Sequence, residues 1–100
     1  MDLIDKWRKR IDEIDLELVK LLNERARSAE EIGKIKQKRG LDAYSPEREE
    51  EVMGNVTSKN RGPLSPNALR RLFERIIDES RAVERTAMQT RKKKSRNGPP

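Results

Sequence analysis

Charged and hydroxyl side chains interrupt the apolar faces of the helices that this sequence predicts. Arg25 falls in a row where isoleucine or leucine otherwise recurs every seventh residue, and Lys36 follows Ile32 by one turn. Ser80 and Glu84 interrupt the apolar stripe of the last predicted helix in the same way. Buried cations are costly unless they are paired. These residues therefore require either neutralising acids or an anionic ligand.

The excess of cations in this set predicts a substrate with more than one negative charge. Arg25 and Lys36 are 11 residues apart, which is about 16 Å along a helix axis, so their long side chains can converge on a small molecule. Arg48 and Glu49 begin another predicted helix and join the set. Arg8 lies about 25 Å before Arg25 on one helix and reaches the same ligand only from an antiparallel partner chain. Arginine can grip a carboxylate with two parallel hydrogen bonds.

The residue types also limit the chemistry. The chain contains no histidine and no cysteine, which removes the usual general base, thiolate ligands and the Ser/His and Cys/His arrangements. We expect no metal and no cofactor. Donors fixed on rigid helices suit a reaction that needs only conformational restraint and stabilisation of a developing charge, such as a unimolecular rearrangement. The alternative is structural, with Arg25 and Glu84 paired as charges that set the register of a helical core.

Three helices are predicted to position these residues, and they run long, short and medium. The first covers residues 2–39 and ends where Gly40 suits the left-handed position after a helix. Ser45-Pro46 starts the second, over about 46–59, and Ser65-Pro66 starts the third. No alternating strand pattern appears, so the fold class is all-α.

The length of the first helix predicts a dimer. Some 35 helical residues make a rod of roughly 50 Å, whereas a compact monomer of 100 residues has a radius of gyration of about 13 Å. The chain cannot bury such a rod by itself. An identical chain is the simplest cover, and we expect an intertwined antiparallel helical homodimer.

Composition gives one domain, over residues 1–90. Hydrophobic residues make up 32% and charged residues 42% of the chain, too polar for a large private core. The net charge is +6, but residues 91–100 carry five of these charges and read as a disordered basic tail. Residues 1–90 therefore carry a net charge of only +1, which argues against a nucleic-acid partner. No apolar run spans a membrane and no signal peptide is evident, so we expect no membrane partner and a cytoplasmic protein.

Five segments form a combined pattern by their order and spacing: residues 7–15, 21–25, 32–36 and 44–49 and the last-helix pattern of residues 72–84. With these segments the chain resembles the all-α (type II) chorismate mutase family, over roughly residues 3–88. The resemblance implies an intertwined dimer that converts chorismate to prephenate by a Claisen rearrangement, in phenylalanine and tyrosine biosynthesis.

The resemblance also implies roles for the cationic residues. Arg25, and Arg8 from the partner chain, would hold the carboxylates of chorismate. Lys36 would donate to the ether oxygen and to a carboxylate. Glu84 would lie at the other side of the ether oxygen, and Arg48 would be a further arginine of the site.

The remaining positions would complete the contacts with substrate. Glu49 would bind the ring hydroxyl by accepting a hydrogen bond from it, and Ser80 would lie near the ring carboxylate. Ser45 stands where many family members have aspartate; it is expected to cap the second helix and to belong to the substrate-binding set.

Two other functions fit the same scaffold. An isochorismate pyruvate lyase needs a similar anion pocket, although Glu49 and the loop before it favour the mutase. A non-catalytic helical dimer could instead dock onto another shikimate-pathway enzyme and regulate it. Formation of prephenate from chorismate would separate these functions.

Overall fold

A computed structural model describes the backbone of residues 2–96 and the side chains of residues 2–89. Three helices account for nearly all of it: α1 over Leu3–Arg39, α2 over Pro46–Ser58 and α3 over Pro66–Arg96. The described residues contain no strand. The all-α fold with helices of unequal length is confirmed.

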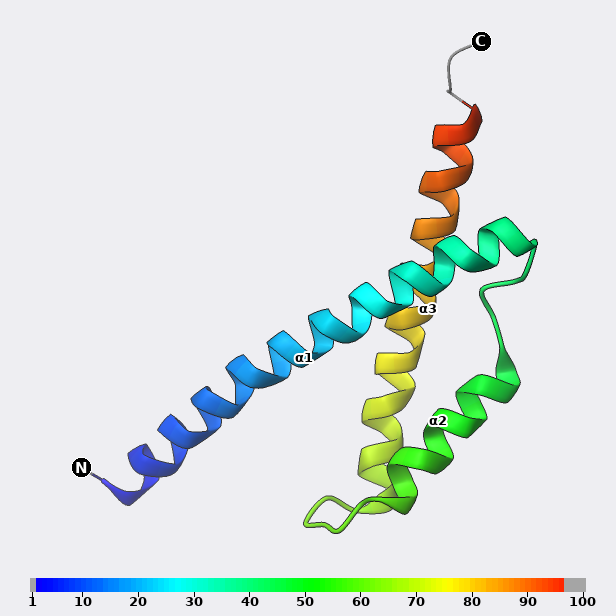
Figure 1. Ribbon diagram of the computed structural model, residues 1–100. Coiled ribbons are helices and arrows are strands. Elements are labelled where there is room, and N and C mark those ends of the chain that lie inside the picture. Colours follow the sequence, from blue (N-terminus) through cyan, green and yellow to red (C-terminus); the bar gives the residue numbers. More distant parts are fainter. Residues whose placement is uncertain (1, 97–100) are drawn as a thin grey trace.

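The helices form an open cross (Figure 1). The C-terminal half of α1 crosses α3, and α2 packs along the first part of α3; α1 and α2 do not pack on each other within the described residues. The chain measures 66 × 31 × 14 Å, with a radius of gyration of 18.0 Å. That is well above the value of about 13 Å for a compact chain of this length.

Helix ends follow the predicted signals with one exception. Gly40 adopts φ 66° after α1, and the Ser65 hydroxyl caps α3 by accepting a hydrogen bond from Ala68 N at 3.1 Å. Ser45 precedes α2, but its side chain makes no capping hydrogen bond. Ser45 is therefore the N-cap residue of α2, as predicted, but its hydroxyl does not take part, and Glu49 N donates to the Ser45 carbonyl at 3.0 Å.

The crossing of α1 and α3 depends on small residues. Ala29 and Gly33 are the buried residues of α1. A Cβ atom added to Gly33 would lie 2.7 Å from the Glu84 carbonyl oxygen and 3.1 Å from the Ala87 Cβ. Glycine costs about 1 kcal/mol of helix propensity relative to alanine. Here it permits close backbone contact between the two helices that carry Lys36 and Glu84.

The N-terminal half of α1 has no such cover. It extends away from α3 (Figure 1), and its apolar stripe lies exposed, with Trp7 at 63% and Ile11 at 55%. In the described residues, no helix is long and apolar enough to cross a membrane.

The expected boundary between residues 90 and 91 does not coincide with a helix end. The backbone of α3 continues to Arg96. Residues 97–100 lie outside the described residues, and the disorder of the basic tail stays a prediction.

Candidate active site

A cavity of about 430 Å³ opens between the C-terminal half of α1, the loop after it, the start of α2 and the middle of α3. This volume suits a small organic ligand. Apolar walls come from Ala29, Ile32, Val52 and Ile77. The polar side chains that line it are Arg25, Ser28, Lys36, Ser45, Arg48, Glu49, Ser80, Arg81 and Glu84. Seven of the eight predicted site residues thus meet in one place; the exception is Arg8.

Arg25 and Ser80 join α1 to α3 across the cavity. The Arg25 guanidinium donates a hydrogen bond through Nη1 to the Ser80 hydroxyl oxygen. The structural alternative of an Arg25–Glu84 pair is not formed among the described side chains, because Glu84 pairs with Lys36 instead. Among the described side chains Arg25 therefore has a hydroxyl and not a carboxylate as its partner, which leaves its guanidinium available to an anion.

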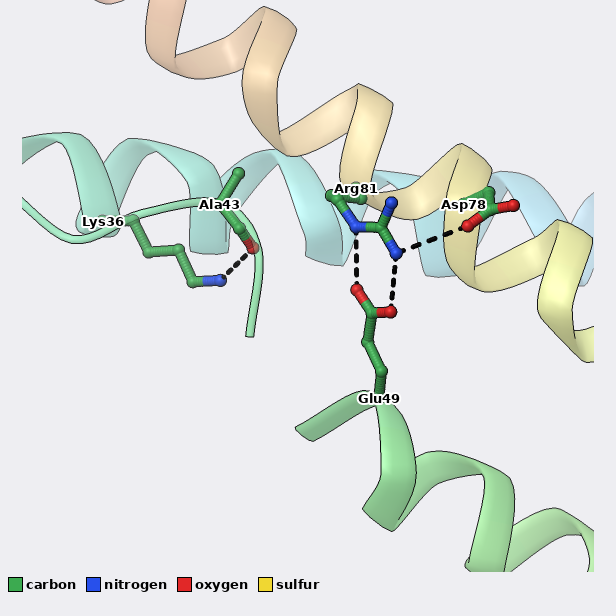
Figure 2. A network of polar contacts seen from close by, with 5 residues as sticks. All are labelled: Lys36, Ala43, Glu49, Asp78 and Arg81. Carbon is green, nitrogen blue, oxygen red and sulfur yellow. Dashed lines mark hydrogen bonds and ion pairs between the residues drawn. The ribbon is translucent and has the colours of Figure 1, made fainter. Parts of the chain in front are cut away.

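Lys36 and Glu84 form the most buried charged pair of the site. Lys36 Nζ lies 2.7 Å from Glu84 Oε1, and the two side chains are 16% and 14% exposed. The ammonium donates its hydrogen bond to the Ala43 carbonyl at 2.9 Å (Figure 2). Glu84 Oε1 is fully buried, and the Lys36 ammonium compensates its charge.

Glu49 is gripped by Arg81, a residue that was not among those predicted from the sequence. Arg81 donates from Nε to Glu49 Oε2 at 2.8 Å and from Nη2 to Glu49 Oε1 at 2.6 Å, a two-pronged contact between α3 and α2 (Figure 2). The hydrogen bond to Glu49 raises the pKa of the Arg81 guanidinium above its ordinary value, against the lowering effect of partial burial. Arg81 was detectable in principle, because Ile77, Ser80, Arg81 and Glu84 share one helical face at three-and-four spacing.

Arg8 and Arg48 differ in their relation to the cavity. The Arg8 side chain is 73% exposed and lies 3.9 Å from Asp5, far along α1 from the crossing. Arg48 lines the cavity while its guanidinium pairs with Glu51 on the next turn of α2. Within one chain, the structure brings Arg48 to the site and does not bring Arg8.

The assembled groups can bind and restrain an anion. Four cations and two carboxylates line the cavity, an excess of two positive charges. Within the described residues, no group of three or more carboxylate, histidine or cysteine side chains could hold a metal ion. The cavity offers guanidinium, ammonium and hydroxyl donors held on three helices. Such groups can stabilise charge without forming a covalent bond to the substrate.

Comparison with known protein families identifies this arrangement. A family model described as chorismate mutase type II matches residues 7–85. The match includes all the cavity-lining residues. The chain belongs to the chorismate mutase type II family.

Its relatives include fused and free-standing proteins. The chain is 44% identical over 85 residues to a bifunctional chorismate mutase/prephenate dehydratase of Neisseria gonorrhoeae, covering 84% of this chain and 23% of that protein. It is 27% identical over 90 residues to a chorismate mutase of Methanocaldococcus jannaschii, covering 89% and 91%. The chain thus spans about a quarter of the bifunctional relatives and nearly all of the free-standing one.

A solved structure shares the fold. A chorismate mutase of Thermus thermophilus superimposes with a TM-score of 0.82 at 37% identity, over 84% of this chain and 96% of that one. The predicted family and helical architecture are therefore confirmed.

Proposed function

We propose that this chain is a chorismate mutase that rearranges chorismate to prephenate. The observation that carries the proposal is the cavity with two excess positive charges, in which the buried Lys36 and Glu84 side chains lie side by side. Chorismate carries two carboxylates. Its rearrangement breaks one ether C–O bond and forms one C–C bond within the same molecule, so the protein needs neither nucleophile nor metal.

The cavity residues divide this task between binding and charge stabilisation. Arg25 holds one carboxylate, and Ser80, fixed by Arg25, lies near the ring carboxylate. Negative charge grows on the ether oxygen as its bond to carbon breaks. Lys36 donates to that oxygen from one side, and Glu84 donates from the other when it carries a proton. Removing one such donor typically costs 10²–10³ in turnover.

The groups at the start of α2 bind the ring substituents. Glu49 accepts a hydrogen bond from the ring hydroxyl. Arg48 exchanges its exposed contact with Glu51 for the substrate. The Ser45 hydroxyl, free of any capping role and lining the cavity, is available to the substrate.

We further propose that the site is completed by a second copy of the chain. The exposed apolar stripe on the N-terminal half of α1 supports this assembly, because a second copy can cover it. Arg8 is exposed on the same half of α1. Arg8 and Arg25 are about 25 Å apart along one axis. In an antiparallel pair, Arg8 of one chain approaches Arg25 of the other and supplies a further cation for a carboxylate. A cytoplasmic location and docking to another shikimate-pathway enzyme stay predictions.

A direct assay tests the function. The purified chain is mixed with chorismate, and loss of chorismate absorbance is followed together with prephenate and pyruvate. We expect saturable conversion to prephenate. Pyruvate as the product would instead indicate the lyase, and no conversion would contradict both enzymes and leave the regulatory dimer.

A matched pair of variants links the activity to the cavity. Lys36→Met removes the buried ammonium and is expected to lower turnover by about 10²–10³. Lys38→Met makes the same change at an exposed position two residues further along α1 and should leave turnover unchanged. Equal effects of the two changes would contradict the assignment of the cavity as the active site.

A further inference from the structure

Arg81 is the charged cavity residue to which the proposed function gives no task. It is held by three elements at once. Its fork meets Glu49 on α2, its Nη2 lies 3.3 Å from Asp78 Oδ1 on α3, and its Cζ lies 5.0 Å from the centre of the Tyr44 ring in the loop after α1. Figure 2 shows the guanidinium between the carboxylates of Glu49 and Asp78. Because these contacts hold the Arg81 side chain in one position, Arg81 can in turn hold the Glu49 side chain in place.

The fork determines how Glu49 can be used. Two parallel N–H···O bonds set both the position and the plane of the carboxylate. Each carboxylate oxygen has two lone-pair directions, so the fork leaves one on each oxygen for a further donor. Glu49 lines the cavity, and its side chain is 25% exposed. It can therefore accept a hydrogen bond from a ligand without leaving Arg81.

Charge gives a second reason for the pair. A dianionic ligand beside an uncompensated Glu49 would meet a third negative charge in a partly desolvated cavity. The Arg81 guanidinium, which stays charged at any working pH, offsets that charge at hydrogen-bond distance. Glu49 then offers an acceptor with little repulsion of the ligand's carboxylates.

We propose that Arg81 is a positioning residue. It orients the Glu49 carboxylate and compensates its charge, so that Glu49 can accept a hydrogen bond from the ring hydroxyl of the substrate. The inference rests on the proposed function, in which Glu49 binds that hydroxyl. A free glutamate side chain loses rotamer freedom when it binds a ligand, and this entropy cost lowers the affinity roughly ten- to thirtyfold. Because Arg81 already orders the Glu49 side chain in the folded protein, this entropy is lost on folding and not on ligand binding.

Steady-state kinetics of the full chain test the proposal through four variants: Arg81→Leu, Arg81→Lys, Glu49→Gln and the double change at both positions. Arg81→Leu should lower kcat/KM roughly ten- to thirtyfold, largely through KM. Arg81→Lys restores a charge without the fork and should recover part of the loss. In the Glu49→Gln background, Arg81→Leu should lower kcat/KM by less than about twofold, because Arg81 acts through Glu49.

A merely structural ion pair gives another pattern. If Arg81 only ties α2 to α3, its removal lowers kcat/KM by the same factor with or without Glu49→Gln, and that result would overturn the proposal. Arg85→Leu is the matched control, since Arg85 lies exposed one turn further along α3, and it should leave kcat/KM unchanged. Thermal unfolding of each variant shows that the proteins compared are folded.

Ligand binding separates this inference from the proposed function. Two cyclic dicarboxylate inhibitors, one with the ring hydroxyl and one without, are titrated by calorimetry into the unmodified chain and into Arg81→Leu. We expect Arg81→Leu to lose affinity for the hydroxyl-bearing compound roughly tenfold and to bind the other as before. Equal losses for both would show that Arg81 acts as a general cation, and the inference would fail. An unmodified chain that binds both compounds without turning over chorismate would refute the proposed function alone.

Discussion

The two halves of α1 carry the same three-and-four apolar pattern but meet different surroundings. In the C-terminal half, Ala29 and Gly33 are buried against α3. In the N-terminal half, Trp7, Ile11 and their neighbours on the stripe are exposed. A periodic stripe predicts that a helix face will be covered, and it does not say by which chain. Residue size supplies what the pattern omits, because small residues mark the close crossing within this chain.

The exposed apolar stripe on the N-terminal half of α1 argues for a partner chain. Full burial of one large aliphatic side chain contributes about 1.5–3 kcal/mol. The exposed members of the stripe in this half are Ile4, Trp7, Ile11, Ile14, Leu18 and Leu21. A second copy of the same face, packed antiparallel, would bury both stripes in a symmetric contact. In the proposed dimer, the two halves of this helix have separate tasks, the site in one and assembly in the other.

The largest expected effect comes from placing a charge on the uncovered stripe. Ile11→Asp removes one buried side chain from each chain of a symmetric pair, so the change counts twice. The dimer should dissociate about 10²–10⁴ times more readily, and turnover should fall with it because Arg8 of the partner is lost. Sedimentation across a concentration series, with turnover measured on the same samples, follows both quantities.

Leu16→Asp is the control for this change. Leu16 is 74% exposed and lies off the stripe on the same half of α1, so association should be unaffected. A stable, fully active monomer of the unmodified chain would contradict the two-chain site. So would an Ile11→Asp variant that associates normally.

The next largest effect belongs to the covered half, at the pair that spans the crossing. Glu84→Ala removes the proposed donor to the ether oxygen and should lower kcat/KM by about 10²–10³. Glu84→Gln supplies a permanent amide donor of similar shape and should retain most of the activity. Steady-state kinetics with chorismate measure both. If the glutamine variant were as impaired as the alanine variant, Glu84 would act as the charge partner of Lys36 and not as a donor.

A smaller effect is expected from the glycine that allows the crossing. Gly33→Ala places a Cβ 2.7 Å from the Glu84 carbonyl oxygen, so α1 and α3 must separate. Overpacking costs about 1–3 kcal/mol, of which about 1 kcal/mol is offset by the better helix propensity of alanine. Activity should fall by roughly ten- to a hundredfold, because a displacement of about 1 Å misplaces Lys36 relative to Glu84.

Gly54→Ala provides the comparison. A Cβ on Gly54 in α2 meets nothing within 4 Å, so the change should stabilise the chain by about 0.5–1 kcal/mol and leave activity unaltered. Thermal unfolding and kinetics of both variants decide the matter. Equal stabilisation at the two positions would show that the close crossing does not constrain the site.

Much of this architecture could be predicted from the sequence because its signals are local. Gly40 and the two Ser-Pro dipeptides locate helix ends to within a residue or two. Inward polar positions follow from helical periodicity, which is why Arg25, Lys36 and Glu84 could each be placed on an inner helix face. Their meeting at one site was implied by the family resemblance. Their roles toward a substrate stay predictions.

What the sequence could not predict depends on contacts between elements. Ser45 and Ser65 stand in the same local context, yet only Ser65 caps its helix through its hydroxyl. The order of residues also does not specify that Glu84 pairs with Lys36 and not with Arg25. Arg81 was not among the predicted site residues, and only the packing of α2 on α3 reveals Glu49 as its partner.

The smallest effect is expected where a helix extends without an apolar stripe. Beyond the crossing, α3 continues to Arg96 (Figure 1). In contrast to the free half of α1, residues 91–96 include no apolar residue, so nothing there requires cover by a partner. Truncation after Thr90 should leave kcat, the dimer and thermal stability nearly unchanged.

Charge is the one property that this truncation alters. It removes five cations and lowers the formal net charge from +6 to +1. Long-range attraction of an anionic substrate should weaken slightly, so KM should rise by about twofold at low ionic strength and return to that of the full chain near 0.5 M salt, where the Debye length is only about 4 Å. Substituting glutamine for Lys92, Lys93 and Lys94 in the full chain should reproduce most of that rise. A tenfold loss of turnover that persists at high salt would show instead that the segment reaches the site, and that α3, like α1, has an end that depends on contacts beyond the crossing.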